Sequence, residues 1–253
     1  MTSAAVDLIL HDVTVTYARV PALHHLSGVI AAGSLTAITG PNGGGKSTLL
    51  KAIMGFVGLA EGRIDRGGLR PRDLGYLPQA HDIDRTFPIT VADLAALGAW
   101  REVGAFGALT VEHQERVRSA LTSVGLDALA HATIQTLSAG QFQRALFARL
   151  LVGAPGVILL DEPFAGVDEV TVAALLAIIH RWHDEGRTVL AVLHDHQQIQ
   201  AHFPATMLLA RECVAWGPTA GVLTPDNLAR AAALTRMWAH EAARGHHPLE
   251  RAS

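Results

Sequence analysis

The stretch "LTAITGPNGGGKSTLLKAIM", residues 35–54, decides the fold. Its apolar start, Leu35–Gly40, is typical of a short buried strand, and Ser47–Met54 has the pattern of a helix. The glycine-rich loop between them lets successive backbone N–H groups wrap a phosphate group. Lys46 stands where its ammonium group reaches the outer phosphates, and the helix N-terminus favours negative charge. Strand, loop and helix in this order predict a site for the phosphates of a nucleotide.

The rest of the chain alternates strand and helix patterns. Leu8–Tyr17 alternates apolar and polar residues like an antiparallel strand. The runs "GVILLDEP" and "TVLAVLHD" are almost wholly apolar, as expected for parallel strands that are buried on both faces. Residues Val91–Leu150 have a helical pattern, interrupted at glycines. We therefore expect an α/β fold with a parallel sheet, an N-terminal antiparallel β region and a helical insertion.

Two acids end the strand in "GVILLDEP". Asp161 stands at the carboxyl end, where a carboxylate can hold Mg²⁺ through the waters of the ion. Glu162 follows directly, where a second carboxylate can orient and deprotonate an attacking water. Adjacent acids at the entry of a loop also cap the next element, and this alternative is stronger for Glu162 than for Asp161.

A second candidate anion site lies in "TLSAGQFQRALFARL", Thr136–Leu150. Ser138 and Gly140 precede an amphipathic helical run, and a hydroxyl with a small turn at a helix N-terminus suits an anion. The chain thus carries two phosphate-binding patterns almost a hundred residues apart.

These motifs together resemble the ATP-binding cassette (ABC) family of ATPases, over almost the whole chain. Leu137–Gln141, "LSAGQ", is similar to the family signature LSGGQ, with Ala139 in place of the middle glycine. The resemblance implies the ABC ATPase fold, which is a P-loop NTPase core with the helical subdomain inserted between Gln79 and the signature. It also implies that two chains pair head to tail in the ATP state, so that each ATP lies between the P-loop of one chain and the signature of the other.

The resemblance assigns roles residue by residue, with ATP and Mg²⁺ as cofactors. The catalytic residues would be Glu162, His194, Gln79 and Lys46. The residues that bind the nucleotide would be Tyr17, Gly40, Pro41, Asn42, Gly43, Gly44, Gly45, Lys46, Ser47, Thr48, Ser138, Gly140, Gln141 and Asp168. Mg²⁺ would be held by Ser47, Gln79 and Asp161. From the residues alone, Tyr17 is also compatible with an ordinary strand-end aromatic, His194 with a core or capping histidine, and Gln79 with a loop glutamine.

The expected organisation is one ABC ATPase domain over residues 1–253. Its core lobe would cover about 1–84 and 156–223, and its helical lobe about 85–155. A C-terminal helical segment, about 224–253, would begin with Thr224 as N-cap and Pro225 in the first position.

The stretch Tyr76–Gly98, "YLPQAHDIDRTFPITVADLAALG", is similar to the zinc and manganese uptake branch of the family, as are "DEPFAGVD" and "ECVAWGPTAGVLTPDNL". This resemblance implies an ATPase that powers a separate membrane permease for import of a divalent metal ion, with zinc favoured and manganese next. The alternatives are a cassette of an iron-siderophore, haem or cobalamin importer and a soluble ABC ATPase that acts on ribosomes or DNA.

The partners implied are a second copy of the chain, an integral-membrane permease and, indirectly, an extracytoplasmic metal-binding protein. A formal net charge of -3 offers no basic excess for nucleic acid. The chain shows no apolar run of the roughly 18 residues that a membrane span needs, and no secretory signal. We expect a cytoplasmic protein, peripheral on the inner face of the cell membrane through the permease.

Two further features leave alternatives open. Fourteen histidines include His180 and His183, one helical turn apart, and His240, His246 and His247 near the end. A regulatory metal site is one interpretation, but solvated surface histidines are favoured because no Cys or acid completes a ligand set at motif spacing. Phe87, next to Pro88, would either anchor the helix that begins near Thr90 or contact the permease.

Overall fold

The computed structural model describes residues 6–18, 20–104 and 107–243. The chain divides into two units. We call Arg72–Val189 the signature unit, and Val6–Pro71 with Leu190–Ser253 the P-loop unit. In the part of the chain that is described, no helix is both long enough and apolar enough to cross a membrane.

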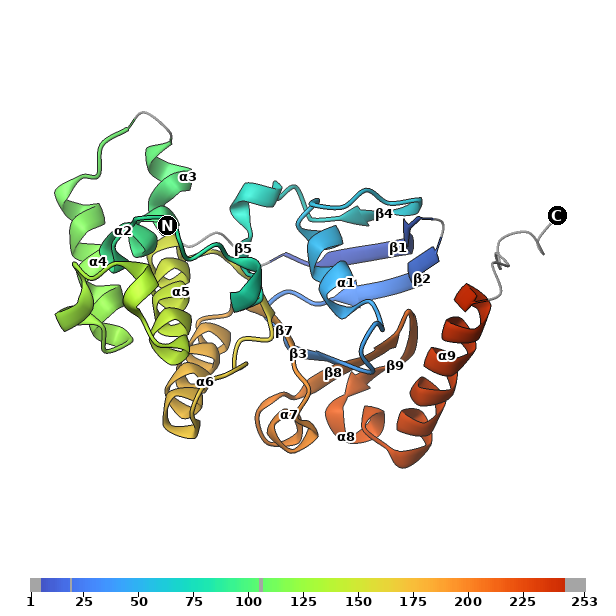
Figure 1. Ribbon diagram of the computed structural model, residues 1–253. Helices are drawn as coiled ribbons and strands as arrows, with labels where there is room; N and C mark the ends of the chain where they lie inside the picture. The colour runs from blue at the N-terminus through green and yellow to red at the C-terminus, as the bar shows by residue number, and fades with distance from the viewer. Residues whose placement is uncertain (1–5, 19, 105–106, 244–253) are drawn as a thin grey trace. The chain divides into compact units, whose positions relative to one another are not determined.

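The P-loop unit is built on two sheets. Three antiparallel strands lie side by side in the order β2-β1-β4 (Figure 1). Their bounds are Leu8–Tyr17 for β1, Val20–Ile30 for β2 and Glu61–Asp65 for β4. In the second sheet β3 (Leu35–Thr39) runs parallel to β8 (Ala205–Ala210), and β9 (Glu212–Pro218) is antiparallel to β8. Every residue of β3 is buried, as its apolar sequence predicts.

Four α-helices lie in the described part of the P-loop unit. They are α1 (Lys46–Ile53), α7 (His196–His202), α8 (Thr219–Val222) and α9 (Pro225–Ala243). The Thr224 hydroxyl accepts a hydrogen bond of 3.3 Å from the backbone N–H of Asn227, so the predicted start of α9 is confirmed. Through Ala231 the helix joins an apolar cluster that includes Leu208 of β8 and Val214 of β9.

The signature unit joins a short parallel pair to a group of helices. Strand β5 (Gly75–Leu77) pairs in parallel with β6 (Val157–Asp161). The α-helices are α2 (Val91–Ala96), α3 (Trp100–Val103), α4 (Val111–Ser123), α5 (Ala139–Gly153) and α6 (Glu169–Asp184). Helices α2, α4 and α5 pack together (Figure 1). The ring of Phe147 on α5 stacks on Trp182 of α6 with 5.6 Å between centroids.

Strand β7 (Thr188–Val192) crosses the division between the units. In the signature unit the backbone N–H of Thr188 donates to Gly156, and in the P-loop unit that of Leu193 donates to Ile38. The strand order is β5-β6-β7 in the first unit and β7-β3-β8-β9 in the second. The predicted α/β class, with a parallel sheet and an N-terminal antiparallel region, is confirmed.

The predicted helical run from Val91 to Leu150 is interrupted more widely than its glycines suggested. Helix α4 ends at Ser123 and α5 begins at Ala139, with only short 3-10 turns between them. The intervening backbone bonds to the entry of α2 instead, since Val91 N–H donates to Ala132 and Ile134 N–H donates to Ile89. These tertiary hydrogen bonds satisfy the backbone that a helix would otherwise satisfy.

Candidate nucleotide-binding site

The loop Gly40–Gly45 connects β3 to α1 in the P-loop unit and packs closely against neighbouring backbone. At Gly40, whose φ is +143°, a Cβ would lie 2.0 Å from the carbonyl oxygen of Leu209. At Gly45, whose φ is +89°, it would lie 2.2 Å from that of Ala22. Only glycine fits either position, so the backbone is fixed with the first N–H groups of α1 at the open end of the loop.

Lys46 is folded over this loop. Its side chain is 6% exposed, and Nζ donates to the carbonyl oxygens of Gly40 and Pro41, both at 2.9 Å. Ser47 and Thr48 follow in the first turn of α1. One ammonium group is thus held beside a row of backbone N–H donors, which is the electrostatic arrangement that phosphate oxygens require.

His194 and Tyr17 also belong to the P-loop unit. His194 follows β7 and is exposed, and the next residue, Asp195, caps α7 by accepting from the N–H groups of Gln197 and Gln198. His194 is therefore neither a core histidine nor the cap. Tyr17 ends β1 with 49% of its surface exposed, which suits either reading of this aromatic.

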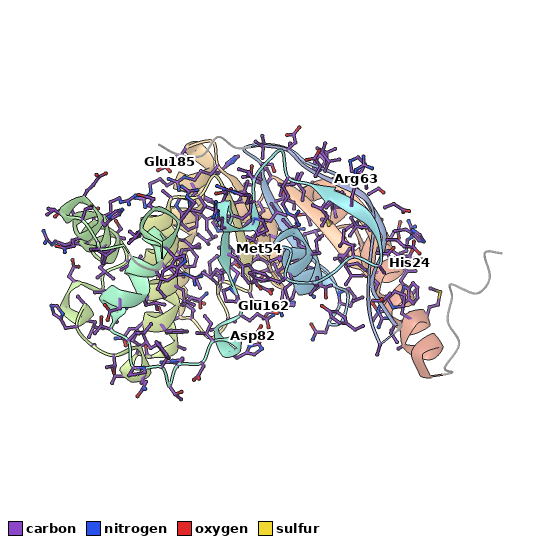
Figure 2. The ribbon with its side chains drawn as sticks, turned by 90° about the horizontal axis from the view of Figure 1, so that it is seen from above. His24, Met54, Arg63, Asp82, Glu162 and Glu185 are labelled. Carbon is purple, nitrogen blue, oxygen red and sulfur yellow. The ribbon has the colours of Figure 1, made fainter. Side chains whose placement is uncertain are left out.

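The two acids and the glutamine come together in the signature unit. Asp161 ends β6 and is fully buried. Glu162, which is labelled in Figure 2, adopts a left-handed φ of +50° and accepts a hydrogen bond of 2.8 Å from Nε2 of Gln79. Backbone strain of this kind, in a residue other than glycine, is concentrated at functional sites. Gln79 follows β5 and Glu162 follows β6. The two strands are parallel neighbours that end at the same edge, so these residues lie close together.

The sequence reasoning gave no role to Tyr76. Its hydroxyl donates to Oδ2 of Asp161 at 3.5 Å, and its carbonyl oxygen accepts from the partly buried guanidinium of Arg149 at 2.6 Å. Burial, and then the negative charge of Asp161, raise the pKa of Tyr76 well above its usual range. The available signal was an aromatic with a polar tip three residues before Gln79, in a strand parallel to the one that ends in the acids.

The signature segment begins α5 with reciprocal caps. The Ser138 hydroxyl accepts from the N–H of Gln141 at 3.2 Å, and Oε1 of Gln141 accepts from the N–H of Ser138 at 2.9 Å. Asp168 caps α6 by accepting from the N–H of Thr171 at 2.9 Å and from its hydroxyl at 2.8 Å, and these bonds lower the pKa of Asp168. Gly140 lies near Asp168, since a Cβ there would be 3.6 Å from its Oδ2.

The predicted residues therefore fall into two sets. Gly40–Thr48, His194 and Tyr17 lie in the P-loop unit. The set in the signature unit consists of Gln79, Ser138, Gly140, Gln141, Asp161, Glu162 and Asp168.

The chain is similar to known proteins over most of its length. The family model for ABC transporters matches residues 23–165. The manganese transport system ATP-binding protein MntB of Bacillus subtilis is 38% identical over 223 residues, which cover 87% of this chain and 89% of that protein. The zinc transport system ATP-binding protein TroB of Treponema pallidum is 37% identical over 225 residues, or 87% of this chain and 84% of that protein.

A solved structure agrees with the fold. The dimeric structure of MJ0796, a bacterial ABC transporter cassette, matches with a TM-score of 0.75 and 25% identity, covering 84% of this chain and 98% of that one. ABC ATPase domains bind ATP, and in this family its hydrolysis powers transport. The extent of the match to the family model and to both relatives shows that this chain belongs to the ABC transporter family and is one of its ATPases.

Proposed function

We propose that the chain is the ATP-hydrolysing subunit of an importer for a divalent metal ion, zinc or manganese. The observation that carries the proposal is similarity over 87% of the chain to subunits named for manganese and for zinc transport systems. The resemblance of Tyr76–Gly98 to the zinc and manganese uptake branch of the family supports the same proposal. As a subunit of such an importer, the protein would lie at the inner face of the membrane on a separate permease, which receives the metal from an extracytoplasmic binding protein.

The hydrolytic roles follow from the local chemistry of each unit. Lys46 and the loop N–H groups would hold the outer phosphates, with Tyr17 against the base and His194 at the γ-phosphate. Glu162 would act as general base, and its bond from Gln79 fixes the carboxylate that takes the proton of the attacking water. Residues 1–84 and 156–223 would form the core lobe, 85–155 the helical lobe and 224–253 the C-terminal segment.

The donor set fits Mg²⁺. Ser47, Gln79 and Asp161 offer a hydroxyl, an amide and a carboxylate oxygen, and Mg²⁺ prefers oxygen ligands with several waters retained. When bound, the ion would supply positive charge that neutralises the charge developing on the phosphate oxygens. The hydroxyl of Tyr76 holds Oδ2 of Asp161 in place, so one carboxylate oxygen is oriented by the protein itself.

We also propose that two chains pair head to tail, with Ser138, Gly140 and Gln141 of one chain against the nucleotide on the P-loop of the other. Gly140 supports this arrangement. Its φ is not left-handed, and a Cβ there would meet only ordinary contacts within the chain at 3.6 Å and beyond. Among the described residues of its own chain none requires glycine at this position, whereas close approach of an external phosphate would.

The segment after Gln79 is a candidate contact for the permease. Phe87 is 63% exposed and the cap of α2 is Thr90, which favours a contact outside the chain over an anchor for α2. Arg85 lies over the ring of Phe142 at 4.7 Å and donates to the carbonyl oxygen of Leu137, which ties this segment to the signature helix. A movement of this segment would therefore displace both Gln79 and Ser138.

The transport proposal is tested in the host organism. A chromosomal Lys46→Ala substitution removes the phosphate-binding charge, and cellular metals are measured by mass spectrometry during growth on limiting zinc or limiting manganese. We expect accumulation of one of the two metals to fall, and growth to recover when that metal is supplied in excess. Unchanged zinc and manganese, with reduced uptake of iron-siderophore, haem or cobalamin, would assign the chain to the other importer branch.

A further inference from the structure

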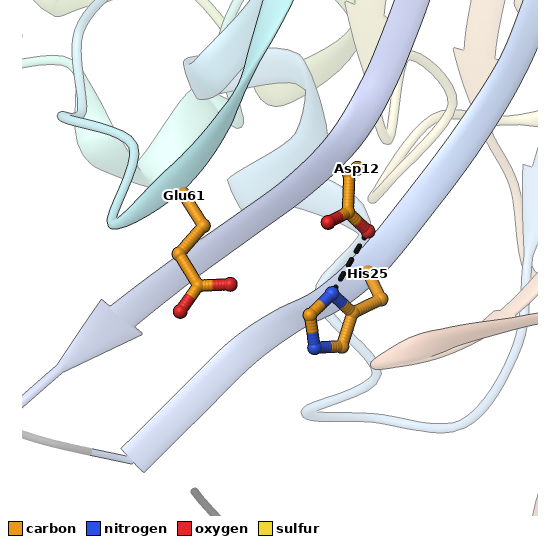
Figure 3. Close-up of side chains that lie close together, drawn as sticks. All are labelled: Asp12, His25 and Glu61. Carbon is orange, nitrogen blue, oxygen red and sulfur yellow. Dashed lines mark hydrogen bonds and ion pairs between the residues drawn. The ribbon is translucent and has the colours of Figure 1, made fainter. Parts of the chain in front are cut away.

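Asp12, His25 and Glu61 form a cluster on the three-stranded sheet of the P-loop unit (Figure 3). One ligand atom from each residue lies within 4.8 Å of the other two. Oδ1 of Asp12 and Nδ1 of His25 are 2.8 Å apart, and the carboxylate of Glu61 faces the same point. All three side chains are exposed and take no part in the nucleotide site described above.

Irregular pairing of the strands orients these side chains. The register of β1 shifts between Leu10 and Val13, and Asp12 in this bulge has a left-handed φ of +53°. On β2, His25 also has a left-handed φ, +48°. Such a conformation costs about 1–2 kcal/mol in a residue with a Cβ. A bulge re-aims a side chain, and here two of them turn a carboxylate and an imidazole toward each other.

The surrounding backbone holds this geometry. The N–H of Asp12 donates to the hydroxyl of Ser27 at 2.9 Å, and that of His25 donates to the hydroxyl of Thr14 at 3.1 Å. At Gly62, whose φ is +80°, a Cβ would lie 2.2 Å from the carbonyl oxygen of Asp12. Strand β4 therefore passes directly against the bulge, and this approach brings Glu61 to the other two residues.

An ion pair between Asp12 and His25 does not explain why the carboxylate of Glu61 also lies beside them. An exposed pair of this kind contributes about 0–1 kcal/mol, less than the strain of two left-handed residues. A second carboxylate beside the first adds repulsion, unless a cation lies between them. A divalent ion supplies two positive charges to two carboxylates and uses the imidazole nitrogen as a neutral ligand.

We propose that Asp12, His25 and Glu61 bind a divalent transition-metal ion of the zinc and manganese class. One imidazole nitrogen with two carboxylates suits these ions, whereas Mg²⁺ and Ca²⁺ prefer oxygen alone and Cu(I) prefers sulfur. Bonds of about 2.0–2.2 Å to the metal require the ligand atoms to move closer together, which the exposed Glu61 side chain allows. Zn²⁺ binds more tightly than Mn²⁺ in the general order of such sites.

The test is calorimetric titration of the full chain without nucleotide, with Zn²⁺ and with Mn²⁺ separately. We expect Glu61→Gln and His25→Asn each to weaken binding at this site by at least about tenfold, the order seen when even an outer partner of a metal ligand is lost. Gln keeps the shape of Glu, and Asn tolerates a left-handed φ, so both variants are expected to fold. Thermal unfolding without metal checks this.

Three control variants separate this site from other metal-binding groups. Glu115→Gln removes an exposed glutamate of the signature unit, Asp161→Asn removes the buried acid, and His246→Ala with His247→Ala removes a histidine pair that lies outside the described residues. All three should retain the site. Mn²⁺ bound to the wild type should show coupling to an imidazole nitrogen by pulsed electron paramagnetic resonance, and His25→Asn should lose it.

The proposal is wrong if Glu61→Gln and His25→Asn bind Zn²⁺ like the wild type. It is equally wrong if binding disappears only in the Asp161 or the His246/His247 variant, or if the folded wild type takes up neither ion.

Discussion

At the scale of single residues, Glu162 carries the sharpest test of the hydrolytic mechanism. Glu162→Gln keeps the size of the side chain and its bond with Gln79 but removes the proton acceptor. We expect ATP binding to persist and turnover to fall by at least about a hundredfold. The variant should accumulate as an ATP-bound dimer. Phosphate release and sedimentation measure both effects, with Glu169→Gln, an exposed glutamate nearby in sequence, as the control. Turnover near the wild-type rate would remove Glu162 from the role of base.

We expect Tyr76 to position Asp161, the acid that is proposed to hold Mg²⁺. Tyr76→Phe deletes only the hydroxyl that donates to Asp161. We expect the Mg²⁺ concentration for half-maximal ATPase activity to rise several-fold with little change in melting temperature at pH 7, because one buried hydrogen bond contributes about 1 kcal/mol. A lower melting temperature with an unchanged Mg²⁺ requirement would mean that the hydroxyl serves only packing.

The same tyrosine predicts a pH dependence of stability. Its pKa in the folded protein is raised above the value of 10.0 expected when it is unfolded. The protonated hydroxyl therefore stabilises the folded state fully below pH 10, and this contribution is lost as the pH rises above 10. The difference in the free energy of unfolding between wild type and Tyr76→Phe, measured by urea titration, should be constant between about pH 8 and pH 9 and shrink as the pH rises above about 10. A difference that stays constant above about pH 10 would contradict the raised pKa.

The sequence was most informative where one residue type is chemically required. The loop around Lys46, the acids after β6 and the cap at Ser138 were all predictable because their chemistry is local. The contacts of Tyr76 with Asp161 and Arg149 were not, since they join residues 85 and 73 positions apart in the chain. They depend on the pairing of β5 with β6, which no local pattern specifies.

At the scale of elements, the sequence predicted β3, β6 and β7, because strands that are buried on both faces are almost wholly apolar. The sequences of β2, β4, β8 and β9 did not show a pattern that predicts a strand. Strand β2 contains a proline and two adjacent histidines, and its register with β1 shifts at the bulges that place His25. The register and the bulges of β2 depend on its pairing with β1 and not on an alternation of apolar and polar residues in its own sequence. The cluster of Asp12, His25 and Glu61 was invisible in the sequence for the same reason.

The segment after Gln79 gives a prediction at this scale. Phe87→Ala should leave the basal ATPase activity of the isolated subunit nearly unchanged, because the ring is exposed and Arg85 holds the segment to the signature helix without it. Co-purification with the permease should fall. Phe56→Ala, which removes another exposed phenylalanine in the P-loop unit, is the control. If melting temperature and basal activity fall while the permease still co-purifies, Phe87 is structural.

At the scale of the whole molecule, one chain carries two helix starts that are proposed to bind phosphate, at Lys46 and at Ser138. The cap at Ser138 satisfies the first N–H groups of α5 only in part, because the capping box uses the N–H of Gln141 and that of Ser138 itself. In the proposed two-fold symmetric dimer, each helix start would be used twice, once in each nucleotide site. Composition of each site from two chains can be tested by mixing variants.

Ser138→Asp keeps an N-cap, so α5 should still form, but it places a negative charge where the partner's γ-phosphate would lie. We expect this variant alone to bind ATP and to hydrolyse it poorly, and Lys46→Ala alone to be inactive. In a mixed dimer, Lys46 of the first chain faces Ser138 of the second, so one site of two is intact. Random pairing makes half of the dimers mixed, so an equimolar mixture should recover up to about one quarter of wild-type activity. A mixture no more active than its separate components would contradict a site built from two chains.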